Sequence, residues 1–160
     1  MHETVIRVAR SSDRDALRRA VVQLQDYERS LHDSRRPGAA IADAYLEWML
    51  AKARANGAVL IAEVGGEFAG LAAGWIEQEE RIQETEDSNR FGFVSDVYVL
   101  PEFRGRRVAS RLIDGLDPYF RRAGVTRVRI GVLAGNRSAR AAYEYSGFVP
   151  YEVIYERSLL

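Results

Sequence analysis

The chain has 160 residues, and its 23 Lys and Arg balance its 23 Asp and Glu, so the formal net charge at pH 7 is zero. A neutral chain lacks the positive field that attracts proteins to nucleic acids and anionic membranes. Cysteine is absent, which excludes disulfides, thiolate zinc sites and a cysteine nucleophile. The N-terminus has no signal-peptide pattern and no apolar run is long enough to span a bilayer, so we expect one cytoplasmic domain over residues 1–160.

The N-terminal part of the sequence predicts a strand followed by a helix. Residues 5–9 have the pattern of a short first strand. A helix is expected to begin near Asp13, with Ser12 as its N-cap and Asp15 placed for a capping-box contact to Ser12. Apolar residues then recur at helical spacing, so this helix is expected to extend as far as His32.

A second helix and a β-hairpin follow. Residues 41–56 predict the helix, and Gly57 ends it. Gly65 and Gly66 separate two apolar runs, residues 58–64 and 67–76, and a glycine pair in that position is typical of a two-residue hairpin turn.

The second half of the chain alternates strands and helices. In chain order it predicts a strand over 91–99, a helix from the turn at 104–109 to Gly124 that Pro118 kinks or divides, a strand over 128–132, a helix after Asn136, and a closing strand over 151–156. The hairpin must be antiparallel, whereas the strand–helix–strand unit is expected to be parallel. The sequence therefore predicts an α/β fold with a mixed sheet.

The Gly/Arg-rich turn at residues 104–109 is the first motif that carries chemistry. Pro101 ends the strand before it, and a helix begins directly after it. The first free N–H groups of that helix would point at the turn, beside the positive end of the helix dipole and several guanidinium groups. This arrangement predicts a binding site for a pyrophosphate.

The helix that follows Asn136 is the second motif. Asn136 is a good N-cap, the alanine-rich interior favours a helix, and Gly147 suits the position after its end. Asn136 and Tyr143 are two turns apart and share a face with the small residue Ala139 between them, which would leave room for a thin ligand arm. Alternatively, this is an ordinary amphipathic helix in which Tyr143 only packs.

Together these motifs resemble the GNAT superfamily of N-acetyltransferases. The turn is similar to the family's Arg/Gln-x-x-Gly-x-Gly/Ala signature, in which Arg104, Gly105 and Ala109 match while Arg107 occupies the inner glycine position. Residues 136–148 are similar to the family's Asn-x-x-Ala-x-x-x-Tyr-x-x-x-Gly-Phe segment at every anchor. The resemblance covers residues 58–157. It implies the GNAT fold, with a mixed central sheet of about six to seven strands flanked by about four helices.

The resemblance further implies direct transfer of an acetyl group from acetyl-CoA to a primary amine of a small molecule or peptide, within a ternary complex and without a metal. Tyr143 would assist the departing CoA thiolate, and the backbone of Val97 to Val99 would polarise the thioester and pair with the pantetheine arm. The residues expected to bind the cofactor are Val97, Tyr98, Val99, Arg104, Gly105, Arg106, Arg107, Val108, Ala109, Asn136, Ala139 and Tyr143.

Several residues are candidates for the general base that removes a proton from the amine. Asp96 is the only carboxylate in the motif strand, and it serves either as the base or as a structural group at a strand bulge. Glu77, Glu79 and Glu80 are substitutes that would act through water. Glu28 and His32 could face the acceptor pocket, although His32 alone has the character of a surface histidine.

Arg107 departs from the family pattern, and we expect it to be tolerated. A residue in the first turn of a helix has negative φ, which Arg adopts without strain. Its side chain would point outward or add a contact to phosphate. If cofactor binding were lost, the chain would be a degenerate GNAT-fold binding module without catalysis.

The sequence leaves the acceptor amine open. Residues 77–87 contain six acids and one arginine, a run that is either a solvated loop or, at the border of an acceptor groove, a reason to favour polycationic amines. We expect no nucleic-acid or membrane partner, and we leave a homodimer open. Nucleic-acid binding through the arginines of the turn and its helix is disfavoured by the neutral total charge; these are Arg104, Arg106, Arg107, Arg111, Arg121 and Arg122.

Overall fold

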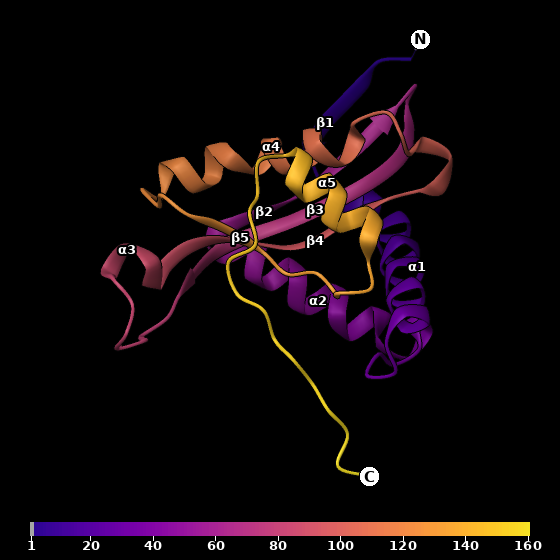
Figure 1. The fold of residues 1–160 in the computed structure, drawn as a ribbon. Helices are drawn as coiled ribbons and strands as arrows, with labels where there is room; N and C mark the ends of the chain where they lie inside the picture. Colours follow the sequence, from indigo (N-terminus) through magenta and orange to yellow (C-terminus); the bar gives the residue numbers. More distant parts are fainter. Residues whose placement is uncertain (1) are drawn as a thin grey trace.

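A computed structural model describes residues 2–160 and contains one mixed sheet with helices on both faces (Figure 1). The strands are β1 (Thr4–Val8), β2 (Gly57–Val64), β3 (Glu67–Gln78), β4 (Arg90–Val99) and β5 (Val128–Ile130). The helices are α1 (Arg14–Leu31), α2 (Gly38–Asn56), α3 (Glu86–Asn89), α4 (Val108–Arg122) and α5 (Arg137–Tyr145), and 3-10 turns cover Ser11–Asp13 and Pro101–Phe103. The strands lie side by side in chain order; the first four are antiparallel, and β5 runs parallel to β4.

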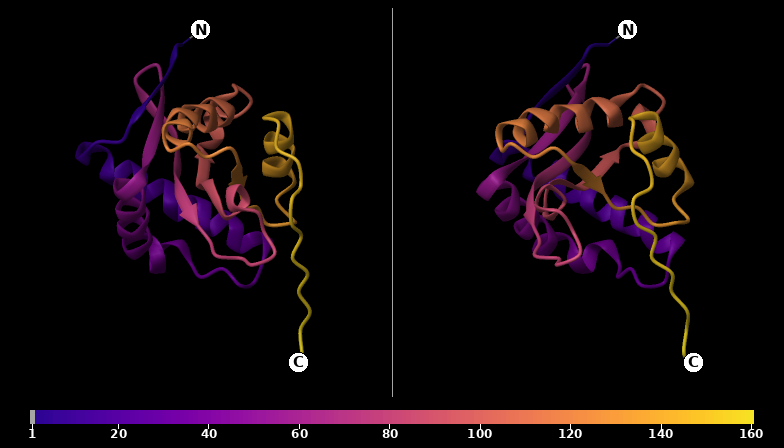
Figure 2. Two further views of the ribbon diagram at one scale, coloured as in Figure 1. Left: turned by 90° about the vertical axis from the view of Figure 1, so that its left-hand side faces the viewer. Right: turned by 60° about the vertical axis from the view of Figure 1, so that its left-hand side comes forward.

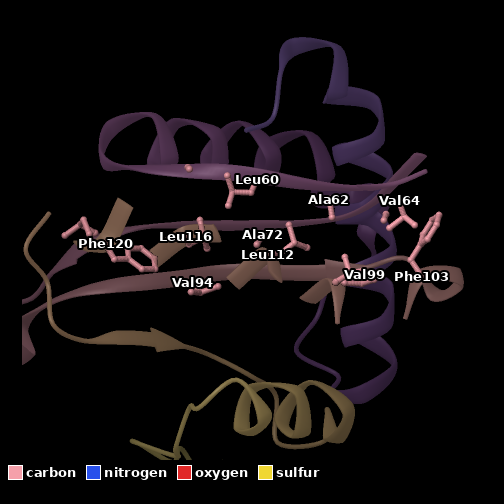
Figure 3. Packing of buried hydrophobic residues seen from close by; sticks show 14 residues of the cluster. Leu60, Ala62, Val64, Ala72, Val94, Val99, Phe103, Leu112, Leu116 and Phe120 are labelled. Carbon is pink, nitrogen blue, oxygen red and sulfur yellow. The ribbon is translucent and has the colours of Figure 1, made fainter. Parts of the chain in front are cut away.

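Two apolar cores lie on the two faces of the sheet. Helices α1 and α2 cover one face, and α4 covers the other, with α5 beside it (Figure 2). Alternate residues of β2 enter different cores: Leu60 packs in the core beneath α4, whereas Ile61 packs beneath α1 and α2. Figure 3 shows the α4 core, in which Leu112 and Leu116 of the helix meet Leu60 and Val94 of the sheet. Burial on both faces explains why these strands read as nearly continuous apolar runs.

The hairpin turn is confirmed. Gly65 and Gly66 both have positive φ, +59° and +84°, and they connect β2 to β3 with Val64 opposite Glu67. Positive φ at both central residues is the requirement of the tight turn that matches strand twist, and glycine meets it without strain.

The predicted mixed sheet is confirmed, but the predicted number of elements is wrong. Residues 2–160 form five strands and five α-helices rather than six to seven strands and four helices. The expected closing strand over 151–156 does not form, because this segment is held by side chains such as Tyr151 and Glu152 rather than by ladder bonds, and it runs away from the sheet (Figure 1). The extra helix, α3, is a single turn that is too short to produce a helical pattern.

Of the two alternatives predicted at Pro118, a kink or a division of the helix, the division is excluded, and the capping box predicted at the start of α1 is wrong. Helix α4 is continuous through Pro118, neither divided nor capped anew at that point. Pro118 and Asp114 are both exposed, so the carbonyl that the proline leaves unpaired four residues earlier faces water. At the start of α1, Ser12 and Asp15 do not form the expected capping box. A 3-10 turn begins before the helix, and there the side chain of Asp13 accepts the N–H of Arg10 at 2.6 Å.

Strand β4, which pairs with β3 on one side and β5 on the other, is irregular where its pairing with β5 ends. A bulge leaves Ser95 without a partner on β3, since Val94 pairs with Gly74 and Asp96 with Ala73. Its pairing with β5 covers only Gly92 to Val94. Beyond the bulge, therefore, β4 has an unpaired edge on the side that β5 leaves.

Candidate functional site

A cavity of about 350 Å³ occupies the space beside the unpaired edge of β4. It is enclosed by the end of β4, the turn before α4, the first turns of α4, and one face of α5. Eleven of the twelve residues predicted to bind cofactor line it, namely Val97, Tyr98, Val99, Arg104, Gly105, Arg107, Val108, Ala109, Asn136, Ala139 and Tyr143. Arg106 does not line it, and its guanidinium lies 5.8 Å from the centre of the Phe103 ring.

The edge of β4 presents main-chain groups to this cavity. Leu100 donates its N–H to the carbonyl of Ala69 on β3 at 2.9 Å. Because successive residues of a strand direct their main-chain groups to opposite sides, Tyr98 also faces β3, whereas Val97 and Val99 face away from it. Val97 and Val99 can therefore bind an extended ligand, and Tyr98 contributes through its side chain only.

The turn before α4 is held in an unusual backbone conformation. Arg104 donates from Nε to the carbonyl of Val99 at 3.0 Å, which ties the turn to the end of β4. Gly105 has φ of +76°, and a Cβ there would meet no atom within 4 Å, so its backbone is open to a ligand. Such a glycine is suited to the close approach of a phosphate.

The expectation that Arg107 has negative φ is wrong. Arg107 is the N-cap of α4 and not a residue of its first turn, with φ of +59° and ψ of +21°. Among residues 2–160 it is the one non-glycine residue with positive φ. Its guanidinium lies 5.7 Å from the ring centre of Tyr145, across the cavity on α5.

The Asn136 cap is confirmed, and it fixes the helix that carries Tyr143. The Asn136 side chain accepts the N–H of Ala139 at 3.2 Å, and Gly147 ends the segment with φ of +89°. Burial raises the pKa of Tyr143 to about 12, and the nearby carboxylates of Glu28 and Asp96 add to the increase. The phenol therefore remains protonated at neutral pH and can donate a hydrogen bond.

A second cavity, of about 360 Å³, lies on the α1 side of the bulge in β4. Asp96 lines it and is 9% exposed. The hydroxyl of Tyr45 lies 2.8 and 3.0 Å from its two carboxyl oxygens, and Ser95 donates to one of them. Burial raises the pKa of Asp96, and the carboxylate of Glu28 reinforces that increase. Asp96 is thus a buried carboxyl whose partners are hydroxyl groups rather than a cation.

The two cavities adjoin. Leu24 of α1 lines both of them. On β4 the change from one to the other falls between consecutive residues, since Asp96 lines the second cavity and Val97 the first. The two cavities therefore border each other at Leu24 and at the step from Asp96 to Val97.

The other candidate bases are distributed differently. Glu28 lines the second cavity and accepts from Arg35 Nε at 3.0 Å. His32 lines neither cavity; its ring contacts Glu156 at 3.0 Å. Glu77, Glu79 and Glu80 also line neither cavity, and Glu77 accepts from Trp75 Nε1 at 2.6 Å.

Two features of the surroundings could not be read from the sequence. Tyr45 is 51 residues from its partner Asp96, and Arg35 lies between α1 and α2, outside any motif. His32, Asp33 and Glu156 bring ligand-type atoms within 4.8 Å of one another at the surface, although 124 residues separate the first from the last.

No helix within residues 2–160 is both long and apolar enough to cross a membrane.

The architecture is shared with solved acetyltransferase structures. An aminoglycoside N-acetyltransferase, AAC(6')-Iy in complex with CoA, aligns with a TM-score of 0.73 and 22% identity over 100% of this chain and 97% of that one. A predicted acetyltransferase from Clostridium acetobutylicum, solved with acetyl-CoA, aligns with a TM-score of 0.75 and 19% identity over 98% of this chain and 97% of that one. These similarities define the fold as that of the GNAT acetyltransferases.

The family follows from the sequence match. The model of the acetyltransferase (GNAT) family matches residues 21–148, and the chain belongs to that family. An uncharacterized N-acetyltransferase of Methanocaldococcus jannaschii is 27% identical over 69% of this chain and 46% of its own length. Two uncharacterized N-acetyltransferases of Bacillus subtilis also match. The first is 29% identical over 53% of this chain and 51% of its own length. The second is 27% identical over 89% of this chain and 88% of its own length. The chain thus spans about half the length of two of these relatives.

Proposed function

We propose that this protein transfers an acetyl group from acetyl-CoA to a primary amine while both are bound. The observation that carries the proposal is the first cavity, which combines an open glycine turn, unpaired main-chain groups of β4 and one face of α5. Acetyl-CoA supplies the activated acyl group and a thiolate leaving group. The neighbouring solved structures that hold CoA or acetyl-CoA support this assignment.

The turn and the strand edge would hold the cofactor through main-chain groups. The N–H groups at the start of α4, with Gly105 leaving the backbone open, would bind the pyrophosphate. Val97 and Val99 would pair with the amides of the pantetheine arm in the manner of an added strand. A main-chain N–H of this edge would also donate to the thioester oxygen as negative charge develops on it.

The acceptor must lose a proton before it can attack. An alkylamine of pKa ~10.4 is neutral in only about one molecule in 2,500 at pH 7. Supplying the free amine therefore costs about 4.6 kcal/mol unless the site accepts the proton. Asp96 is our candidate for this role, because burial raises its pKa and so increases its affinity for a proton.

Tyr143 is our candidate for the group that assists departure of the thiolate. Its phenol is protonated at neutral pH and lies on the α5 face of the first cavity. A hydrogen bond to sulfur would stabilise the thiolate as the carbon–sulfur bond breaks.

Metal-independent binding of acetyl-CoA tests the proposal directly. Isothermal calorimetry should give the same affinity in EDTA as in magnesium. Gly105→Val should weaken binding by about tenfold, since an L residue with a left-handed backbone costs ~1–2 kcal/mol and the turn must distort to relieve it.

The matched control for Gly105→Val is Gly66→Val. Gly66 also has positive φ, and a Cβ there would likewise meet no atom within 4 Å, but it lies in the β2–β3 hairpin. This variant should lose comparable stability and keep full affinity. Absence of acetyl-CoA binding by the unaltered protein would instead favour a degenerate binding module without catalysis.

A further inference from the structure

The second cavity has a composition that restricts the acceptor. About half of its wall is apolar, and this half comes from four separate segments, with Leu24 on α1, Phe93 on β4, Leu133 after β5 and Ile154 in the C-terminal segment. Its charged side chains are Glu28, Arg35 and Asp96. A ligand that fills it can therefore place an apolar body against these four segments and a small charged group near the charged side chains.

The charges within the cavity nearly cancel. Glu28 is paired with Arg35 at 3.0 Å, so its negative charge is already compensated. Asp96 is the remaining carboxyl, and hydroxyls rather than a cation occupy its oxygens. One ammonium group can be matched here, whereas a second or third would find no further unpaired carboxylate in the wall of this cavity.

The acidic run does not change this balance. None of the acids between residues 77 and 87 lines either cavity. Several already have partners of their own: Glu77 is near Lys52 at 3.5 Å, Glu84 bonds Ser88, and Asp87 is paired with Arg127 at 3.0 Å. The run is therefore a peripheral surface and not a set of polycation subsites beside the acceptor cavity.

We infer that the acceptor is a primary amine with a single ammonium group on an aromatic or branched aliphatic body, and not a polyamine or an aminoglycoside. This inference rests on the proposed acetyl transfer. The ammonium group would lie at the Asp96 end, next to the first cavity, and the body would lie against Leu24, Phe93 and Leu133. The volume of about 360 Å³ suits a molecule of that size.

An acceptor panel tests the inference. Phenylethylamine, isoamylamine, ethylamine, spermidine and kanamycin are compared by CoA release, with the products identified by mass. The value of kcat/KM for phenylethylamine should exceed that for ethylamine by at least tenfold, because only the former buries a ring. It should also exceed the values for spermidine and kanamycin by at least tenfold.

A charge placed in the wall sharpens the test. Leu133→Glu adds a carboxylate to the cavity from a partly buried loop position. It should lower kcat/KM for phenylethylamine at least tenfold and narrow the gap to spermidine. Ile82→Glu is the matched control, since Ile82 is fully exposed within the acidic run at residues 77–87 and lines neither cavity. It should leave the selectivity between phenylethylamine and spermidine unchanged.

The possible failures are separable. If calorimetry shows that acetyl-CoA binds but spermidine or kanamycin is the preferred acceptor, or neither apolar amine is acetylated, the inference is overturned and cofactor binding stands. The inference is also overturned if Leu133→Glu and Ile82→Glu behave alike. If acetyl-CoA does not bind, the proposed function fails first, and the inference fails with it.

Discussion

The two cavities of this molecule are lined by different kinds of groups. The first is lined by residues from two stretches of the chain, within 97–113 and 136–146, together with Leu24 and Tyr27. Unpaired main-chain groups of β4 also face it. The second collects side chains from α1, α2, β4, the segment after β5 and the C-terminal segment. The first cavity depends mainly on backbone conformation, whereas the second depends on side chains that the fold brings together from distant segments.

This difference corresponds to the two ligands that we propose. A cofactor that is the same in every related enzyme can be bound by backbone N–H groups and a turn, which many sequences can form. An acceptor that differs between enzymes must be recognised by side chains. Substitutions in the first cavity should therefore act through backbone strain, except at Tyr143, and substitutions in the second should act through the side chain that is replaced.

The largest effect is expected at Tyr143, the exception in the first cavity. Tyr143→Phe retains the ring and removes only the hydroxyl, so acetyl-CoA should bind as before while kcat falls about 100-fold, near the lower end of the range for general acid assistance. Calorimetry and steady-state kinetics measure the two effects separately. Tyr119→Phe, a hydroxyl removed from α4 outside both cavities, should change neither. Equal loss of affinity and turnover would mean that Tyr143 acts in binding.

Asp96 tests the second cavity. Asp96→Asn should lower kcat about tenfold near pH 7, and the rate should recover as the pH approaches the pKa of the amine, where free nucleophile is already present. The measurement is a pH–rate profile with an accepted amine. Asp43→Asn removes an exposed carboxylate that is paired with Arg18 and should leave the profile unchanged. A uniform decrease at all pH values would assign Asp96 a structural role.

The same carboxyl should affect stability with pH. Its pKa in the folded protein is raised from the ordinary 3.8 by burial, so between these two values the folded state binds more protons than the unfolded state. The free energy of unfolding must then fall as pH rises from 3.8 through the raised pKa. In Asp96→Asn this decrease should be absent, which urea titrations between pH 4 and 8 would detect. An unchanged pH dependence would mean that Asp96 ionises normally.

Local features of the fold were predictable, and distant contacts were not. The Gly65–Gly66 turn and the Asn136 cap each depend on residues within a few positions, so the sequence was sufficient for them. The hydroxyl partner of Asp96 on strand β4 is Tyr45 on helix α2, 51 residues away, and no spacing rule connects them. The closing strand failed for a related reason: alternating residues show that a segment can pair, but not that an edge will accept it.

The smallest effect is expected at Arg107, and there backbone and side chain can be separated. Arg107→Gly should relieve the cost of a left-handed non-glycine residue, ~1–2 kcal/mol, while losing the contact with Tyr145 and adding the chain entropy of glycine, each ~0.5–1 kcal/mol. These terms nearly cancel, so the net change in the free energy of unfolding should lie within about 1 kcal/mol of zero. Acetyl-CoA should bind at least as tightly.

Arg106→Gly is the control, because the neighbouring residue has a similar ring contact, 5.8 Å from Phe103 against 5.7 Å for Arg107 and Tyr145, but no positive φ. It loses the same kind of contact and gains the same chain entropy without relief of strain, so it should be destabilised by about 1 kcal/mol. Urea denaturation of both variants gives the difference directly. If both were destabilised equally, the left-handed backbone at Arg107 would carry no cost. If Arg107→Gly bound acetyl-CoA more weakly, its guanidinium would be a phosphate ligand, and the first cavity would depend on a side chain after all.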